Sequence, residues 1–333
     1  MTTRSLRLGT RASELARTQS QLVADAILTR TGRAVELVPV RTEGDVRPGP
    51  LASLGGTGVF VSALRDALLA GEVDLAVHSL KDLPTAPADG IALAAVPPRE
   101  DPRDVVVARD GLTLGELPPG SRVGTGAPRR VAQLEALGLG IELTELRGNV
   151  DTRIGKVRSG DLDAVVLARA GLARLGRVDE ATEVLDPIQV LPAPGQGALA
   201  VECRAADADL VRLLADALDD PHTRAAVTAE RVVLAELEAG CAAPVGALAE
   251  VAEGDDGEEL WIRAVALSPD GALAVRRSAS GPATDPVGVA RALAAEMISD
   301  GAHQLLDPTA VPPEMPAEMP AEVHAPHQAR RQQ

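Results

Sequence analysis

Short apolar runs of strand length alternate with longer helix-like segments from Leu6 to Gly301, and this alternation restricts the fold more than any other feature. Such an order is typical of an α/β protein, in which helices pack on a mostly parallel sheet. The predicted strands are Leu6–Gly9, Val35–Val40, Leu75–His78, Val105–Ala108, Arg122–Gly124 and Ala164–Ala168. The predicted helices are Ser13–Arg30, Val59–Ala70, Arg129–Leu137, Asp207–Leu218 and Val287–Ser299.

Two pairs of segments repeat in the same order along the chain. The segment Arg7–Ala12 (RLGTRA) resembles Arg122–Ala127 (RVGTGA), and Gly71–Val77 later resembles Gly160–Val166. Each member of the first pair is a short strand that leads into a helix. The repeat indicates two similar α/β domains that face each other, and the space between such domains is a usual ligand site.

The chain changes character from residue 221 onward. Val227–Glu238 is predicted to be a helix, and Leu260–Leu267 and Leu273–Ser278 are predicted strands around the turn Pro269–Gly271. From Asp307 the composition shifts to Pro, Ala, Glu and Met, which cannot build a core. We therefore expect residues 307–333 to be disordered and dispensable.

Composition narrows the class of protein. Apolar residues make up 45% of the chain, with one Phe, one Trp and no Tyr, so the core must be aliphatic. No apolar run approaches the roughly 18 residues of a membrane span, and the N-terminus lacks a signal-peptide pattern, so we expect a cytoplasmic protein. The net charge of −15 argues against a nucleic-acid partner. Two cysteines and five scattered histidines predict neither disulfides nor a metal site.

A polar cluster follows the predicted strand Leu75–His78. Ligands of open α/β sheets bind at the carboxyl ends of strands, and Ser79, Lys81 and Asp82 stand at that point. An aspartate beside a lysine can stay ionised while partly buried, ready to stabilise a cation or move a proton. The alternative is a surface turn with an incidental Lys/Asp pair.

A glycine-rich turn, Gly124–Arg130, leads from a predicted strand into a helix. Its backbone N–H groups and the helix dipole attract anions. Arg129 and Arg130 oppose that dipole, which indicates that they serve a ligand, and the planar arginine fork suits carboxylates. A dinucleotide site is the alternative, but neither the GxGxxG nor the Walker A spacing is present.

Further arginines fall on other predicted turns, and each alone is most often a solvated surface residue. They are Arg11, Arg147, Arg153 and Arg174. Because the facing domains can bring these turns to one crevice, the set favours a small ligand with several carboxylates.

The segment Glu238–Gly246 predicts a tight loop that holds Cys241 between small residues. A thiol there can be exposed and serve as an attachment point, although base rates favour an inert buried cysteine. Cys203, in an apolar run, fits the inert interpretation.

Several motifs together resemble the porphobilinogen deaminase (hydroxymethylbilane synthase) family. AVHSLKDLPT, REDPRD, LRGNVDTR, LPAPGQGA and AGCAAPVG occur in the family's order between Leu6 and Leu306. The resemblance implies two periplasmic-binding-protein-like α/β domains and a smaller α+β C-terminal domain that carries the cysteine loop. The expected boundaries are 1–98 with 196–218, 99–195 and 219–306, followed by the 307–333 tail.

The resemblance also implies a reaction, the head-to-tail condensation of four porphobilinogen molecules into hydroxymethylbilane with loss of ammonia. Cys241 would hold a dipyrromethane cofactor through a thioether, and Asp82 would be the catalytic carboxylate. The acetate and propionate arms of cofactor and chain would be bound by Arg11, Arg129, Arg130, Arg147, Arg153 and Arg174. Ser13, Lys81 and Thr125 fall on matching polar positions.

The sequence departs from the family pattern in two places. Lysines that many relatives carry in the loop Gly44–Gly58 are replaced by Ser53 and Thr57, and Gly126 and Ala127 stand where relatives often have serines. We nevertheless expect an active enzyme, working as a monomer. The rival hypothesis is a binding protein or sensor that kept the scaffold, but such a protein needs neither Asp82 nor a tethered cofactor.

Overall fold

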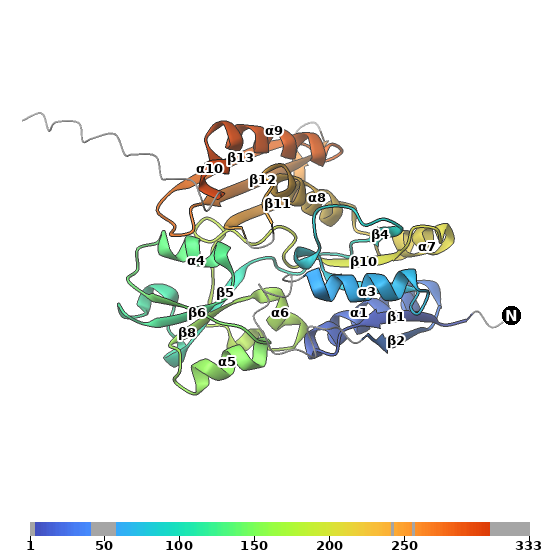
Figure 1. Cartoon of the computed structure of the whole chain (residues 1–333), viewed down its shortest axis with the longest axis horizontal. Helices are drawn as coiled ribbons and strands as arrows, with labels where there is room; N and C mark the ends of the chain where they lie inside the picture. The colour runs from blue at the N-terminus through green and yellow to red at the C-terminus, as the bar shows by residue number, and fades with distance from the viewer. Residues whose placement is uncertain (1–3, 41–57, 241–242, 255–256, 307–333) are drawn as a thin grey trace, which may run out of the picture.

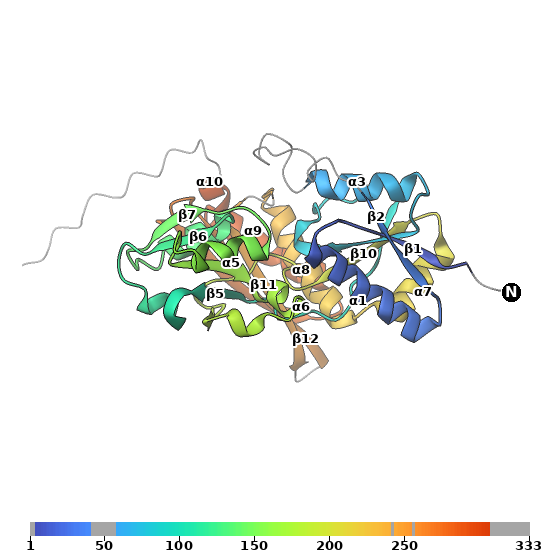
Figure 2. The same cartoon turned by 90° about the horizontal axis from the view of Figure 1, so that it is seen from below.

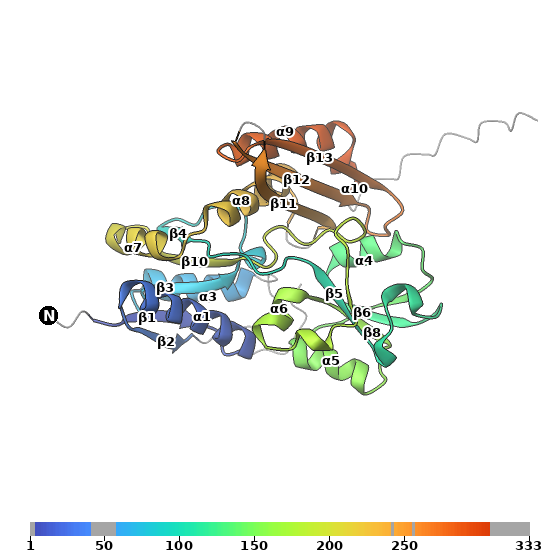
Figure 3. The same ribbon diagram turned by 180° about the vertical axis from the view of Figure 1, so that it is seen from behind.

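The computed structural model describes residues 4–40, 58–240, 243–254 and 257–306 of the chain. These residues form two five-stranded sheets that lie side by side and a three-stranded sheet that adjoins both (Figures 1 and 3). The predicted α/β class is therefore confirmed. Residues 44–57 of the predicted loop, Cys241 and the tail from residue 307 lie outside the described part.

In the first unit, four strands of the sheet point the same way and one, β10, runs against both of its neighbours. The order is β2-β1-β3-β10-β4, and the strands are β1 (Leu6–Thr10), β2 (Val35–Pro39), β3 (Leu75–Ser79), β4 (Ile91–Ala95) and β10 (Leu199–Arg204). The helices of this unit are α1 (Glu14–Thr31), α3 (Gly58–Leu69) and α7 (Ala208–Leu218).

The second unit repeats this topology with other residues. Its order is β7-β6-β8-β5-β9, and β5 runs against both of its neighbours. The strands are β5 (Asp104–Ala108), β6 (Arg122–Thr125), β7 (Glu142–Glu145), β8 (Ala164–Ala168) and β9 (Glu183–Val184). The helices are α4 (Pro128–Glu135), α5 (Val150–Arg158) and α6 (Arg169–Arg174). Strands β1 and β6, and likewise β3 and β8, hold equivalent places, as the sequence repeat predicted.

The third unit is a three-stranded antiparallel sheet packed against helices, which confirms the smaller α+β unit. Its elements are α8 (Pro221–Glu236), β11 (Val245–Gly254), β12 (Gly257–Leu267), β13 (Ala274–Pro282), α9 (Pro286–Ser299) and α10 (Ala302–Leu306). Two sequence predictions were wrong here. Helix α8 begins at Pro221 because Asp220 caps it, its carboxylate accepting from Thr223 N–H at 2.7 Å. The predicted loop up to Gly246 is shorter, since β11 begins at Val245.

The core is aliphatic throughout the described residues. In the first unit, Leu8, Ile27 and Leu214 are fully buried between the sheet, α1 and α7. Trp261 lies on the surface with 56% of its area exposed, so it contributes little to any core. None of the described helices is both long enough and apolar enough to cross a bilayer.

The chain passes between the two α/β units twice, through residues 96–103 and residues 185–198, called here the crossover segments. They lie side by side, because Glu100 N–H donates to the Gly197 carbonyl at 3.2 Å. Helices α1 and α6 contact each other where the two units meet (Figure 2). Four short 3-10 helices complete the described fold, at Leu80–Asp82, Arg109–Gly111, Leu114–Glu116 and Val178–Glu180.

Candidate active site

The turn that follows β3 carries the central residues of the site. Strand β3 is followed at once by the 3-10 helix Leu80–Asp82. The Leu80 side chain is fully buried, and its N–H donates to the Ala198 carbonyl at 3.0 Å, which fixes the turn against the second crossover segment. Lys81 and Asp82 therefore lie at the carboxyl end of a strand, where α/β sheets bind ligands.

Two cavities meet at this turn, and both are lined by Lys81, Asp82, Arg130 and Arg153. The inter-unit cavity lies between the α/β units and is also lined by Leu15, Gln19, Ser79, Gly148, Asn149, Val150, Leu167, Ala168, Ala170, Gly171, Arg174 and Gly197. The third-unit cavity is also lined by Gly126, Ala127, Pro128, Arg129, Ala193, Pro194, Gln196, Leu234, Gly240, Ala243 and Val245. Among the described residues that line either cavity, Asp82 is the one carboxylate, and it stands among five cations.

The Lys81 side chain is held in place by a hydrogen bond to Gln196. Its Nζ donates to Oε1 of Gln196 at 3.2 Å. Burial lowers the pKa of Lys81 to about 8, with Arg130 adding to the decrease and Asp82 opposing it. Lys81 is therefore mostly charged at pH 7 and loses its charge in mildly alkaline solution.

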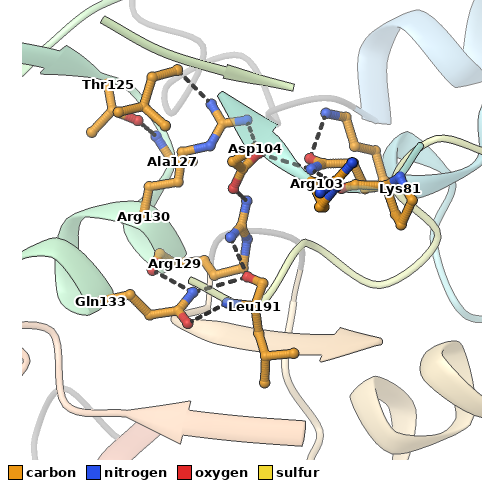
Figure 4. A network of polar contacts seen from close by, with 12 residues as sticks. Lys81, Arg103, Asp104, Thr125, Ala127, Arg129, Arg130, Gln133 and Leu191 are labelled. Carbon is orange, nitrogen blue, oxygen red and sulfur yellow. Dashed lines mark hydrogen bonds and ion pairs between the residues drawn. The ribbon is translucent and has the colours of Figure 1, made fainter. Parts of the chain in front are cut away.

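Arg129 and Arg130 lie in the first turn of α4 and are both buried. Each donates to Asp104, the Arg129 Nη2 atom to Oδ2 at 2.8 Å and the Arg130 Nη2 atom to Oδ1 at 2.7 Å (Figure 4). The Nη1 atom of each arginine donates to backbone, that of Arg129 to the Leu191 carbonyl and that of Arg130 to the Val166 carbonyl. The two cations that sequence reasoning assigned wholly to a ligand thus share a protein carboxylate.

Sequence reasoning missed both Asp104 and Gln196. Asp104 is fully buried as the first residue of β5; burial alone would raise its pKa, but Arg129 and Arg130 outweigh burial and hold the pKa well below its usual range. Gln196 donates to Asp104 Oδ1 at 2.8 Å and accepts from Lys81. The sequence signal for Asp104 was its place directly before the apolar run Val105–Ala108, because a charged residue buried there needs a buried partner.

Two further predicted arginines line the inter-unit cavity. The Nε atom of Arg153, on α5, donates to the Gly148 carbonyl at 2.8 Å, and burial and Arg130 lower its pKa. Arg174, at the end of α6, donates to the Gly197 carbonyl at 2.6 Å. Burial lowers the pKa of Arg174 to about 10, against the opposing charge of Glu100. Both side chains remain cations at neutral pH.

The structure does not bring every predicted residue to the cavities. Arg147 is exposed and pairs with Glu145, with its Nη2 atom 2.6 Å from the carboxylate. Ser13 caps α1, its Oγ accepting from the third helical N–H at 3.3 Å. Thr125 is buried at the end of β6, where its Oγ1 accepts from the Ala127 N–H at 3.4 Å. Arg11 is half-buried just after β1 and is likewise absent from the described lining.

Comparison with protein families decides the relationship. Residues 6–212 match the model described as porphobilinogen deaminase, dipyromethane cofactor binding domain, and residues 224–299 match the porphobilinogen deaminase C-terminal domain. The chain belongs to the porphobilinogen deaminase family. The family resemblance predicted from the sequence motifs is confirmed.

Curated members of the porphobilinogen deaminase family match nearly the whole chain. Porphobilinogen deaminase 1 of Streptomyces coelicolor is 61% identical over 315 residues, which cover 92% of this chain and 98% of that protein. The porphobilinogen deaminase of Mycobacterium tuberculosis is 59% identical over 306 residues, 90% of this chain and 98% of that protein. Among solved structures, a periplasmic substrate-binding protein from Coxiella burnetii is similar at a TM-score of 0.43 and 15% identity, over 65% of this chain and 92% of that one.

The residues present fit the carboxylate-bearing cofactor that the deaminase family model names. The buried Nε atoms of Arg129 and Arg130 have no hydrogen-bond partner within the described part of the chain, and both residues line the third-unit cavity. Gly240 and Ala243, which flank the two residues 241 and 242, line the same cavity. Donors and cavity thus suit an anionic group on this side of Asp82. No group of three or more His, Cys, Asp or Glu side chains suited to a metal occurs among the described residues.

Proposed function

We propose that this chain is a hydroxymethylbilane synthase of tetrapyrrole (haem) biosynthesis. It condenses four porphobilinogen molecules head to tail, consumes one water, and releases four ammonia molecules and hydroxymethylbilane. The observation that carries the proposal is one carboxylate, Asp82, placed where two cation-lined cavities meet in a member of the porphobilinogen deaminase family.

The cations would bind the carboxylates of cofactor, substrate and growing chain. Charge-assisted hydrogen bonds from arginine to carboxylate are about twice as strong as neutral ones, and a partly dry cavity strengthens them further. Arg129, Arg130, Arg153 and Arg174 are the residues proposed for this role on the geometry described. Arg11 and Arg147 stay in the proposal as predicted binders that would need a different side-chain position.

Asp82 would act on the reacting ring. Its carboxylate would accept a hydrogen bond from the pyrrole N–H and stabilise the positive charge that develops as ammonia leaves. The same oxygen atoms would help to move the proton released when the new carbon–carbon bond is complete. Lys81 beside it would place a positive charge next to this carboxylate.

Cys241 would carry the dipyrromethane cofactor through a thioether. In the sequence Cys241 is bonded to Gly240, which lines the third-unit cavity, and this neighbour supports the assignment of the cofactor to that cavity. When bound, this cofactor supplies the first pyrrole carbon to which porphobilinogen is added. We therefore propose that the third-unit cavity holds the cofactor, that the inter-unit cavity receives substrate, and that Asp82 lies between them.

The rival hypothesis of a non-catalytic binding protein or sensor is not supported. Relatives at about 60% identity over most of their length are named as deaminases, and the carboxylate that catalysis would need is present. We also propose that the protein is a cytoplasmic monomer without a nucleic-acid partner. The proposed domain boundaries lie at 98/99, 195/196 and 218/219. Light scattering of the purified protein tests the monomer directly.

One experiment tests the function and the tether together. Purified protein is mixed with porphobilinogen, and loss of substrate and release of ammonia are followed, while intact mass is measured before the reaction. We expect one ammonia for each porphobilinogen consumed, and a mass that exceeds the chain by two pyrrole units and returns to the chain mass in Cys241→Ala. Full activity at the mass of the bare chain would contradict the tether, and no consumption of porphobilinogen by the loaded protein would contradict the function.

A further inference from the structure

Asp104 is a fully buried carboxylate beside the site, and it accepts three side-chain hydrogen bonds. Its Oδ1 atom accepts from Arg130 at 2.7 Å and from Gln196 at 2.8 Å, and its Oδ2 atom accepts from Arg129 at 2.8 Å. A buried carboxylate with three donors is fixed in place, and it fixes its donors in turn. Both guanidinium groups that it holds line the third-unit cavity.

The bonds of Asp104 continue across the boundary between the α/β units. Gln196 donates to the Pro102 carbonyl at 2.6 Å as well as to Asp104, and its Oε1 atom accepts from Lys81 at 3.2 Å. Lys81 belongs to the first unit, whereas Arg129 and Arg130 belong to the second. Figure 4 shows Lys81 and Arg130 on opposite sides of Asp104. The polar chain therefore connects the two halves of the carboxylate-binding site.

The connection through Asp104 and Gln196 lies where the chain passes between the two α/β units. Asp104 is the first residue after one crossover segment, and Gln196 lies within the other. Because the chain crosses between the two units here, groups attached at this point are joined to both units through the backbone.

We propose that Asp104, acting through Gln196, is a positioning residue that holds Arg129 and Arg130 at a fixed place relative to Lys81. The effect of Asp104 on turnover rests on the proposed function, whereas its role in holding the two arginines does not. Asp104 also supplies negative charge to Lys81. Without it, Lys81 would face Arg129, Arg130 and, across the shared cavities, Arg153, and Asp82 would be the one opposing charge among the described residues that line these cavities. Loss of the Asp104 charge should therefore make Lys81 easier to deprotonate.

The chain permits a direct measurement, because Lys81 and Lys156 are its only lysines. Protein labelled with 13C at lysine Cε gives two NMR signals, and their pH titrations report the two amines separately. Lys156 lies on the surface beside Asp161 and serves as an internal control. In Asp104→Asn the midpoint of the Lys81 titration should fall by about one pH unit, which is the effect expected for the loss of one nearby charge. The midpoint of the Lys156 titration should not change.

Steady-state kinetics with porphobilinogen provide the second measurement. Misplaced binding groups should lower kcat/KM of Asp104→Asn by about 100-fold, with most of the loss in KM because Asp82 keeps its place. Gln196→Leu removes the connection without changing a charge and should lower kcat/KM by about tenfold. The matched control is Asp101→Asn, three residues before Asp104; its partners Arg103 and Arg169 line neither cavity, so activity should not change.

Each result decides the proposal. A shifted Lys81 signal together with raised KM supports it. Unchanged Lys81 titration and unchanged KM in a folded Asp104→Asn, even with a lower melting temperature, would show a purely structural residue and overturn it. If Asp104→Asn does not fold, Gln196→Leu with wild-type KM overturns it and with raised KM supports it. A wild-type protein that does not consume porphobilinogen contradicts the proposed function alone, and the NMR titration still decides the role of Asp104.

Discussion

At the scale of single residues, Asp82 has no second carboxylate to replace it among the described residues that line the two cavities. Asp82→Asn, which keeps the shape, and Asp82→Ala should both fold and lose about 100-fold to 10,000-fold in kcat, the usual loss of an acid–base group. The measurement is the rate of porphobilinogen consumption at saturating substrate. Asp89→Asn, an exposed aspartate after the same turn, is the control and should be fully active. Wild-type kcat in folded Asp82→Asn would remove Asp82 from the mechanism.

Single residues were predictable where one local rule placed them. The position of Lys81 and Asp82 follows from the end of a recognisable strand. The contact of Arg130 with Asp104 does not, because these residues are joined only through the order of strands in the second sheet. Arg147 shows the converse: a basic residue on a conspicuous turn pairs with its neighbour Glu145.

At the scale of elements, helix α3 is pinned to strand β10 by a buried ion pair. Arg65 donates to Glu202 at 2.6 Å and 3.0 Å, and Glu202 is only 2% exposed. Burial alone would raise the pKa of Glu202, but His78 and Arg65 lower it to about 2. The native pKa is depressed, so the stabilisation is complete above the unfolded value of about 4.5 and is lost as the pH falls towards 2.

This ion pair predicts the acid limb of the stability profile. A pKa difference of that size corresponds to about 3 kcal/mol of unfolding free energy, present at pH 7 and absent near pH 2. Glu202→Gln should therefore be less stable than wild type at pH 7, and the gap should shrink on acidification. Denaturant unfolding between pH 7 and pH 3 measures it, with exposed Glu72→Gln as the control. A gap that is constant with pH would contradict the assignment.

Most elements could be predicted because their apolar periods are local. Strands such as β8 were predicted with the observed bounds, and the sequence repeat anticipated two sheets of equal topology. The antiparallel insertion of β10 between β3 and β4 could not be read in the same way, because it joins residues from before and after the second unit. The local apolar pattern does not predict that the chain returns to the first sheet after the second unit.

At the scale of the whole molecule, the two crossover segments touch at a glycine. Gly197 has φ of +87°, and a Cβ there would collide with the Glu100 carbonyl oxygen and approach the Pro102 Cα atom at 3.3 Å. Gly197→Ala should thus destabilise the protein by about 2 kcal/mol or more, since backbone cannot move aside cheaply. Gly160→Ala, with φ of +79° and open space, isolates the backbone strain and should cost about 1 kcal/mol. Equal melting temperatures for the two variants would contradict close packing of the crossovers.

One buried carboxylate, that of Glu230, bonds the third unit to both crossover segments. Glu230 of α8 is completely buried; it accepts from Arg99 at 2.7 Å and 2.9 Å, and from the N–H groups of Gly195 at 2.6 Å and Ala249 at 2.8 Å. Arg99 and Gly195 belong to the two crossover segments, so a single side chain orients α8, and the residues that follow it, against both.

Glu230→Gln should therefore affect the whole molecule. It removes the charge that compensates Arg99, and breaking a buried ion pair typically costs about 3–5 kcal/mol. We expect a large decrease in the unfolding free energy at pH 7, measured by denaturant titration. Glu236→Gln on the same helix, whose partner Arg291 is 66% exposed, should cost less than about 1 kcal/mol. If the two variants lost similar stability, Glu230 would not be what holds the third unit to the crossover segments, and α8 would owe its position to apolar contacts such as that of Val227 with Leu80 and Val96.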